Sequence, residues 1–118
     1  LDLDALGDGY GFRKLRKELG VTAFGVNVIT IPPGYETGSH FHDEQEELYF
    51  VHRGAIEITF GDGTAHRLEE GGSARVDAST VRQVNNGSTK DDAVYLVAGG
   101  KDGYVGRDGK QPEGETKR

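Results

Sequence analysis

The chain of 118 residues contains no cysteine, so disulfide bonds and thiol chemistry are excluded. It also lacks a signal-peptide pattern and any apolar run near the roughly 20 residues that a membrane-spanning helix needs. Basic residues are outnumbered, and a net charge of −6 gives no basis for binding nucleic acid or an anionic membrane. These absences predict a cytoplasmic protein with neither kind of partner.

Hydrophobic residues are also scarce at 34%, whereas glycine is frequent with 19 residues. This balance is typical of many short strands joined by tight turns rather than of a helical bundle. The length allows one domain with a single core. Composition and length therefore favour an all-β fold.

Side chains that can bind a metal or take part in chemistry are concentrated between Gly34 and Gly54, in the stretch GYETGSHFHDEQEELYFVHRG. His40 and His42 are two residues apart, so on an extended segment their imidazoles share a face and can bind one ion. Glu47 follows five residues later, and its carboxylate can complete a three-point site. The run LYFV, with its aromatic and β-branched residues, predicts that this part is a strand.

The gaps in this stretch are five residues from Gly34 to His40, one to His42, four to Glu47 and six to Gly54. This spacing resembles the first motif of the cupin superfamily. The resemblance implies a cupin-like β-barrel (a double-stranded β-helix or jelly roll) of two antiparallel sheets. It also implies that His40, His42 and Glu47 bind a divalent metal ion, either iron, manganese, nickel or zinc.

A second family motif is present in a degenerate form. Counted from Gly71, its remaining positions fall on Asp77, Ser79, Arg82 and Asn86, and only the glycine and the asparagine match. Arg82 stands where the family has its last metal-binding histidine, and a protonated guanidinium cannot ligate a metal. Alternation along TVRQVN puts Arg82 and Val84 on one face. The alignment with the family motif implies that this face is the interior one, which would bring Arg82 near His40, His42 and Glu47.

Three functions remain open at this point. Two histidines and one carboxylate leave positions on a metal free for oxygen and substrate, which implies dioxygenase- or isomerase-like chemistry on a small anionic molecule. Arg82 then binds the anion, and Tyr35 and Tyr49 are candidates to contact the substrate. Alternatively, Arg82 replaces the metal and pairs with Glu47 in a non-catalytic, metal-free module that binds or senses a small molecule. The third function is a metal-free isomerase or lyase with a tyrosine or histidine base.

We divide the chain into an N-terminal arm (residues 1–20), a barrel (21–100) and a polar C-terminal tail (101–118) whose residues 113–118 we expect to be mobile. Within the arm, residues 12–20 fit strand-like or irregular structure better than a short helix. The basic side chains there, Arg13, Lys14, Arg16 and Lys17, are interpreted as a solvated face rather than an anion site.

Strands are expected at residues 21–31, as a long central strand, and at 91–100, as the last strand. A hairpin is expected to join 55–60 to TAHRL. His52 and His66 lie outside the metal pattern. Leu48 and Phe50 are expected on an apolar outer face through which two copies form a homodimer.

Overall fold

The structure, a computed structural model, describes residues 1–5, 9–106 and 108–112. The elements in this part of the chain are η1 (Leu3–Ala5), β1 (Gly11–Arg13), α1 (Leu15–Leu19), β2 (Gly25–Ile31), β3 (Phe41–His42), β4 (Glu46–Arg53), β5 (Ala55–Phe60), β6 (Ala65–Glu69), β7 (Ser73–Val76), β8 (Arg82–Asn85), β9 (Ala93–Gly100) and β10 (Gly109–Lys110). The predicted all-β class is confirmed. Among the described helices, neither is long and apolar enough to cross a membrane.

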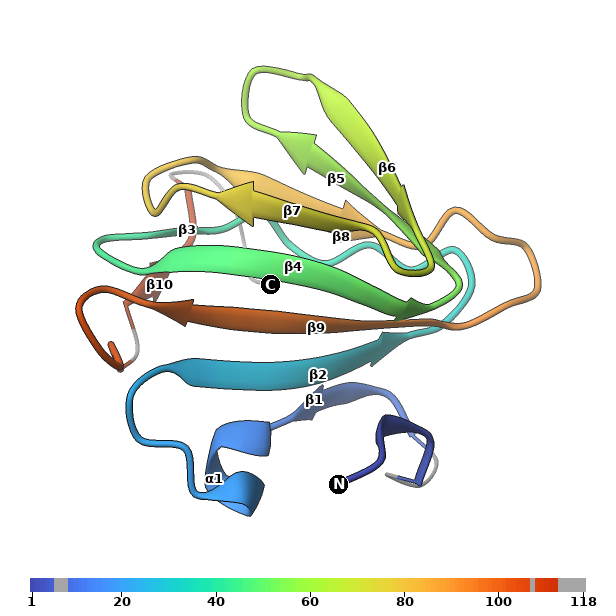
Figure 1. Cartoon of the computed structure of the whole chain (residues 1–118). Coiled ribbons are helices and arrows are strands. Elements are labelled where there is room, and N and C mark those ends of the chain that lie inside the picture. The colour runs from blue at the N-terminus through green and yellow to red at the C-terminus, as the bar shows by residue number, and fades with distance from the viewer. Residues whose placement is uncertain (6–8, 107, 113–118) are drawn as a thin grey trace.

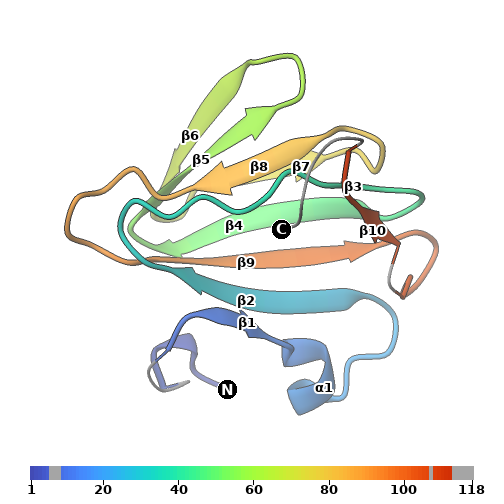
Figure 2. The same ribbon diagram turned by 180° about the vertical axis from the view of Figure 1, so that it is seen from behind.

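Five strands form one antiparallel sheet in the order β1-β2-β9-β4-β7 (Figure 1). A second layer contains the sheet β6-β5-β8 and the pair β10-β3. Residues 36–40 connect these two groups, because Glu36 bridges to Asn85 and His40 bridges to Arg82. Seen from behind, this segment runs beside β8 on its way to β3 (Figure 2). The chain therefore has the two antiparallel layers that the resemblance implied.

Alternation along β4 decides which of its side chains enter the space between the layers. Glu47, Tyr49 and Val51 are buried, whereas the residues between them are exposed. Because successive strand residues point to opposite faces, Glu47 is carried on the same face as the core. That core consists of Ile29, Ile31, Tyr49, Val51, Ile56, Ile58, Val76, Val84, Ala93, Tyr95 and Val97.

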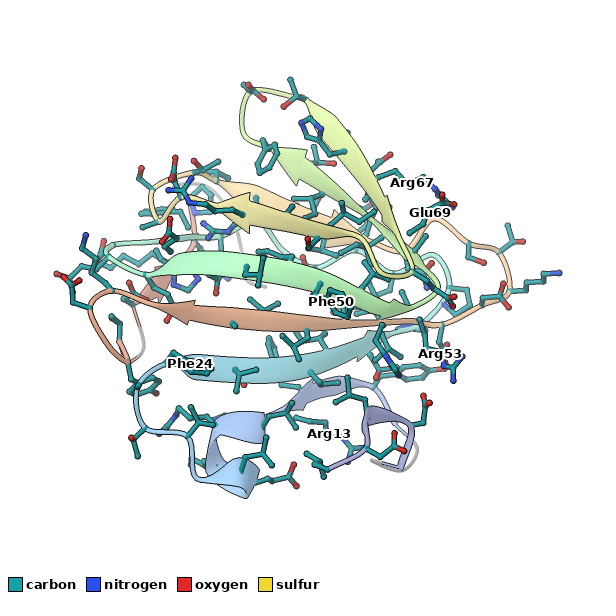
Figure 3. All side chains as sticks on the ribbon, viewed as in Figure 1. Arg13, Phe24, Phe50, Arg53, Arg67 and Glu69 are labelled. Carbon is teal, nitrogen blue, oxygen red and sulfur yellow. The ribbon has the colours of Figure 1, made fainter. Side chains whose placement is uncertain are left out.

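The outer face of the five-stranded sheet is only partly covered. Leu15 of α1 packs there against Val26 and Val28 of β2. On β4, by contrast, Leu48 remains 46% exposed and Phe50 38% exposed. Figure 3 shows Phe50 on the side of the sheet that is turned toward the viewer. The predicted outward position of these two side chains is confirmed.

The N-terminal segment differs from the expectation. Its short strand β1 pairs with β2, but residues 15–19 form the helix that the sequence disfavoured. Burial of Leu15 stabilises this helix, and Gly20 ends it in the left-handed conformation with φ of 75°. The predicted strand at 21–31 starts only at Gly25, because Val21 still donates a backbone hydrogen bond to the helix at Arg16.

The expectations about strand order have mixed outcomes. The strand β2 is flanked by β1 and β9, as expected of a central strand. By contrast, β9 is not the last strand, because β10 follows it. The hairpin of β5 and β6 is confirmed by the pairing of Ala55 with Glu69 through Thr59 with Ala65. Residues 113–118, expected to be mobile, lie outside the described residues.

Candidate metal centre

Backbone pairing positions the two histidines of the motif. His40 and Arg82 exchange two backbone hydrogen bonds of 2.9 Å, which fixes His40 beside the start of β8. His42 pairs with Gly109 in the β3-β10 ladder, and its N–H donates to the carbonyl of Ala78 at 2.8 Å. The residues that separate the histidines in sequence from Glu47 form the turn into β4, so all three side chains converge.

The three side chains offer ligand atoms that all lie within 4.8 Å of one another. His40 Nε2 is 3.9 Å from Glu47 Oε1, and His42 Nε2 is 3.3 Å from Glu47 Oε2. Each of the three residues is buried. The sequence thus identified three potential ligands that the fold brings into one cluster.

Asp108 fixes the orientation of the His42 ring from outside this cluster. Its Oδ1 is 2.8 Å from His42 Nδ1, and its Oδ2 accepts hydrogen bonds of 2.8 Å from the N–H groups of Glu44 and Gln45. Burial by itself would lower the pKa of His42, but the carboxylates of Glu47 and Asp108 outweigh it and raise that pKa. A proton on Nδ1 leaves the lone pair on Nε2 directed toward Glu47.

Arg82 lies close to the cluster and contacts one of its members. The guanidinium is fully buried, and its NH2 donates to Glu47 Oε1 at 3.1 Å. Its NH1 donates to the carbonyls of Ala78 and Thr80, at 3.1 and 2.6 Å. The inward position predicted for Arg82 is confirmed. NH1 and NH2 thus donate to protein acceptors, whereas Nε has no hydrogen-bond partner among the described residues. The substrate-binding role stays a prediction that the contacts of NH1 and NH2 do not favour.

Glu47 receives further hydrogen bonds from Tyr49 and Gln45. The Tyr49 hydroxyl donates to Oε1 at 3.0 Å, and Gln45 Nε2 donates to Oε2 at 2.8 Å. Burial opposes the charged carboxylate, but the nearby imidazoles of His40 and His42 and the charge of Arg82 lower the pKa of Glu47. Burial raises the pKa of Tyr49, and the negative charge of Glu47 acts in the same direction. Tyr49 is therefore a neutral donor to an ionised carboxylate at neutral pH.

These residues face a cavity of about 830 Å³ between the two layers. His40, His42, Glu47 and Tyr49 line one part of it, and Tyr35 lines it as an exposed side chain. The volume is in the range of sites that hold small molecules. The two other histidines lie elsewhere: His52 is hydrogen-bonded to Asp4 at 3.0 Å, and His66 is exposed on β6. Their exclusion from the predicted ligand set agrees with the structure.

The family described as Cupin domain matches residues 27–99, which is more than half of the chain. The chain belongs to this family. No curated protein sequence matches it. Among solved structures, a protein described as a sugar phosphate isomerase from a cupin superfamily, from Silicibacter pomeroyi, is 28% identical with a TM-score of 0.70, over 86% of this chain and 74% of that one. A cupin protein from Bacteroides fragilis is 25% identical with a TM-score of 0.71, over 93% and 86%.

In other similar structures, the match covers a smaller share of the other chain. One described as a putative sugar phosphate isomerase, from Acidithiobacillus ferrooxidans, is 26% identical with a TM-score of 0.64, over 75% of this cupin and 56% of that chain. A structure described as that of DMSP lyases is 26% identical with a TM-score of 0.63, over 76% and 44%. The likenesses therefore join one fold to more than one activity.

The donor set of this cupin fits a divalent metal. His42 Nε2 is buried, and within the described residues it has no hydrogen-bond partner, as expected of a nitrogen directed at an ion. Two imidazoles and one carboxylate are ligands that iron, manganese, nickel and zinc accept. The support of His42 by Asp108 is the carboxylate–histidine arrangement that commonly orients metal ligands.

Sequence reasoning missed Asp108 and Gln45 as members of this site. Asp108 is 66 residues from His42, in a glycine-rich polar segment without a recognisable motif. Gln45 lies inside the motif at a position that the spacing leaves unspecified. Neither the pattern nor the periodicity of the sequence offered a signal for them.

Proposed function

We propose that this cupin binds one divalent metal ion through His40, His42 and Glu47 and acts on a small anionic molecule in the barrel. The observation that carries the proposal is the convergence of three buried ligand atoms within 4.8 Å. When bound, the ion supplies Lewis-acid polarisation of a substrate oxygen. Isomerase-like and dioxygenase-like reactions are both compatible with this ligand set.

The chain's own residues have separate duties under this proposal. Asp108 holds the His42 ring, and Gln45 and Tyr49 keep the carboxylate of Glu47 in place. The low pKa of Glu47 keeps it ionised at neutral pH. Tyr35 and Tyr49 line the cavity and are proposed to contact the substrate. Similarity to proteins described as sugar phosphate isomerases supports an anionic substrate, because a sugar phosphate is one.

A metal-free binding module is the second candidate, and the contact between Arg82 and Glu47 favours it. At 3.1 Å the guanidinium already compensates the charge of the buried carboxylate without a metal.

The third candidate, a metal-free isomerase or lyase with a tyrosine or histidine base, is less well supported if Tyr49 is the base. The raised pKa of Tyr49 makes its hydroxyl a poor base at neutral pH.

Metal titration tests the proposal. We expect protein purified without an affinity tag and then stripped of metal to bind one equivalent of manganese or zinc in isothermal titration calorimetry. His42→Ala should abolish this binding, whereas His66→Ala, which removes an exposed histidine outside the cluster, should leave it intact. No binding by the parent protein, or equal loss in both variants, would favour the metal-free module.

The pH dependence of metal binding is a second prediction. Because the pKa of His42 is raised, protons compete with the metal at a pH where an ordinary histidine is already neutral. The measured metal affinity should therefore decrease as pH is lowered through this raised pKa. Titrations over a pH series should show the decrease beginning above pH 6.5, roughly the value for a free histidine. A decrease only below that value would contradict the prediction.

The homodimer and the cytoplasmic location remain predictions, as does the division into arm, barrel and tail.

A further inference from the structure

The cavity that contains the candidate ligands extends to the N-terminal segment of the chain. Besides His40, His42 and Glu47, its lining includes Lys14, the residue just before α1, and Arg16 within α1. β1 is an edge strand that pairs with β2, and this pairing places the N-terminal segment at the edge of the five-stranded sheet. Two cations therefore line the same space as the metal ligands, although the sequence was interpreted as placing them on a solvated face.

Arg16 is held in a defined position by an aromatic ring. Its guanidinium carbon is 4.0 Å from the centroid of Tyr104, which lines the cavity as well. Stacking occupies the face of the guanidinium and leaves the N–H groups at its edge available for a bidentate acceptor. Among the described residues, no carboxylate forms an ion pair with Arg16 or Lys14.

These two cations are notable in a chain with 20 acidic and 14 basic residues. Other arginines, such as Arg53 and Arg75, pair with carboxylates. Arg82 also has its partner in Glu47, and it is not among the residues that line the cavity. An anionic ligand in this cavity therefore finds its available cations at Lys14 and Arg16 rather than at Arg82.

We propose that Lys14 and Arg16 form an anion subsite that binds the phosphate group of a phosphorylated small molecule in the cavity. The fork of Arg16 and the point charge of Lys14 match the two charges and several oxygens of a phosphate monoester. The rest of the molecule lies along the cavity toward His40, His42 and Glu47. This inference rests on the proposed function, because it specifies the anionic group of that substrate.

The test is a titration of ¹⁵N-labelled, metal-free protein with inorganic phosphate at constant ionic strength, followed by amide chemical shifts. Shifts are expected at residues 14–16 and at Tyr104. Lys14→Ala and Arg16→Ala should each weaken phosphate binding by about tenfold, the loss expected for one charge-assisted hydrogen bond. Lys17→Ala is the matched control, because Lys17 is an exposed cation on the same helix that does not line the cavity.

Three outcomes would overturn the subsite. Phosphate shifts that spread over the surface, or an equal loss of affinity in Lys17→Ala, would show only diffuse attraction to positive charge. Acetate binding as tightly as phosphate would exclude the phosphate assignment. The spectra also report whether each variant is folded, and Arg16→Lys, which retains the charge but not the planar fork, should bind phosphate more weakly than the parent.

Manganese titration of the same variants separates this inference from the proposed function. We expect Lys14→Ala and Arg16→Ala to bind manganese as the parent does, because neither residue is a metal ligand. Failure of the parent to bind manganese, with phosphate binding intact at Lys14 and Arg16, would disprove the metal proposal alone. Normal manganese binding without localised phosphate shifts would disprove the subsite alone.

Discussion

At the scale of single residues, Arg82 decides how the centre can work. It replaces a ligand of the family pattern with a buried cation that bonds to the remaining carboxylate. Removing one member of a buried ion pair is expected to destabilise the metal-free protein by about 3–5 kcal/mol. The same contact holds Glu47 in place and reduces its availability to a metal. Under the proposed function, we therefore expect Arg82 to stabilise the metal-free state and to lower the affinity for a metal.

Arg82→His should increase the affinity for manganese or zinc by roughly tenfold or more, since a fourth neutral ligand replaces a repelling charge. Arg82→Ala removes the charge without supplying a ligand, so its affinity should stay below that of Arg82→His. Calorimetric titration of both variants provides the comparison, with circular dichroism as the check of folding. Equal affinities in the two variants would show that residue 82 does not reach the metal.

Asp108 is the second residue whose contribution can be measured separately. Asp108→Asn removes the charge that fixes the His42 ring, and loss of such a supporting group typically weakens metal binding by about 10–100-fold. Asp91→Asn is a control of the same chemistry at an exposed position. Imidazole ¹⁵N shifts of His42 should change toward the other tautomer in Asp108→Asn only. Unchanged shifts and unchanged affinity would remove Asp108 from the site.

At the scale of elements, the turns explain why the first motif ends in glycine. Gly54 joins β4 to β5 with φ of 73°, and a Cβ added to it would lie 2.6 Å from the carbonyl oxygen of Asp92. Both the backbone conformation and the available space therefore require glycine. This turn sets the path of β5 after β4 leaves the site.

Gly54→Ala should destabilise the protein more than Gly63→Ala. Gly63 also has a positive φ, of 89°, but a Cβ there would meet nothing within 4 Å. Gly63→Ala should lose about 1–2 kcal/mol of unfolding free energy from backbone strain alone. The additional loss in Gly54→Ala measures the clash with Asp92. Urea denaturation of both variants gives the two values, and equal values would contradict the clash.

At the scale of the whole molecule, Leu48 and Phe50 form an exposed apolar strip on the outer face of β4. This strip predicts association of two copies. Light scattering of the parent should give twice the chain mass of 12.8 kDa at micromolar concentration. Phe50→Lys places a charge in the strip and should return the mass to that of one chain. Phe24→Lys changes a phenylalanine of similar exposure, 44%, just before β2 and is the control (Figure 3). A parent of 12.8 kDa would contradict the dimer.

The sequence alone determined the candidate ligand set, because that set depends on local spacing. His40 and His42 share a face at i and i+2, and Glu47 follows after one turn on a strand whose alternation is visible in the letters. The all-β class and the inward side of β4 are local in the same sense. The helix at residues 15–19 was missed because its stability depends on packing Leu15 against Val26 and Val28.

Only the tertiary structure decided which distant residues complete the site. Asp108 reaches His42 through the β10-β3 pair, and Arg16 reaches the cavity through the β1-β2 pair and the ring of Tyr104. The arginine at position 82 was visible in the sequence. That its guanidinium donates to Glu47 rather than to a bound anion depends on the acceptors packed around it. These contacts join residues far apart in the chain, and no periodicity records them, because they arise only when the two layers close around one cavity.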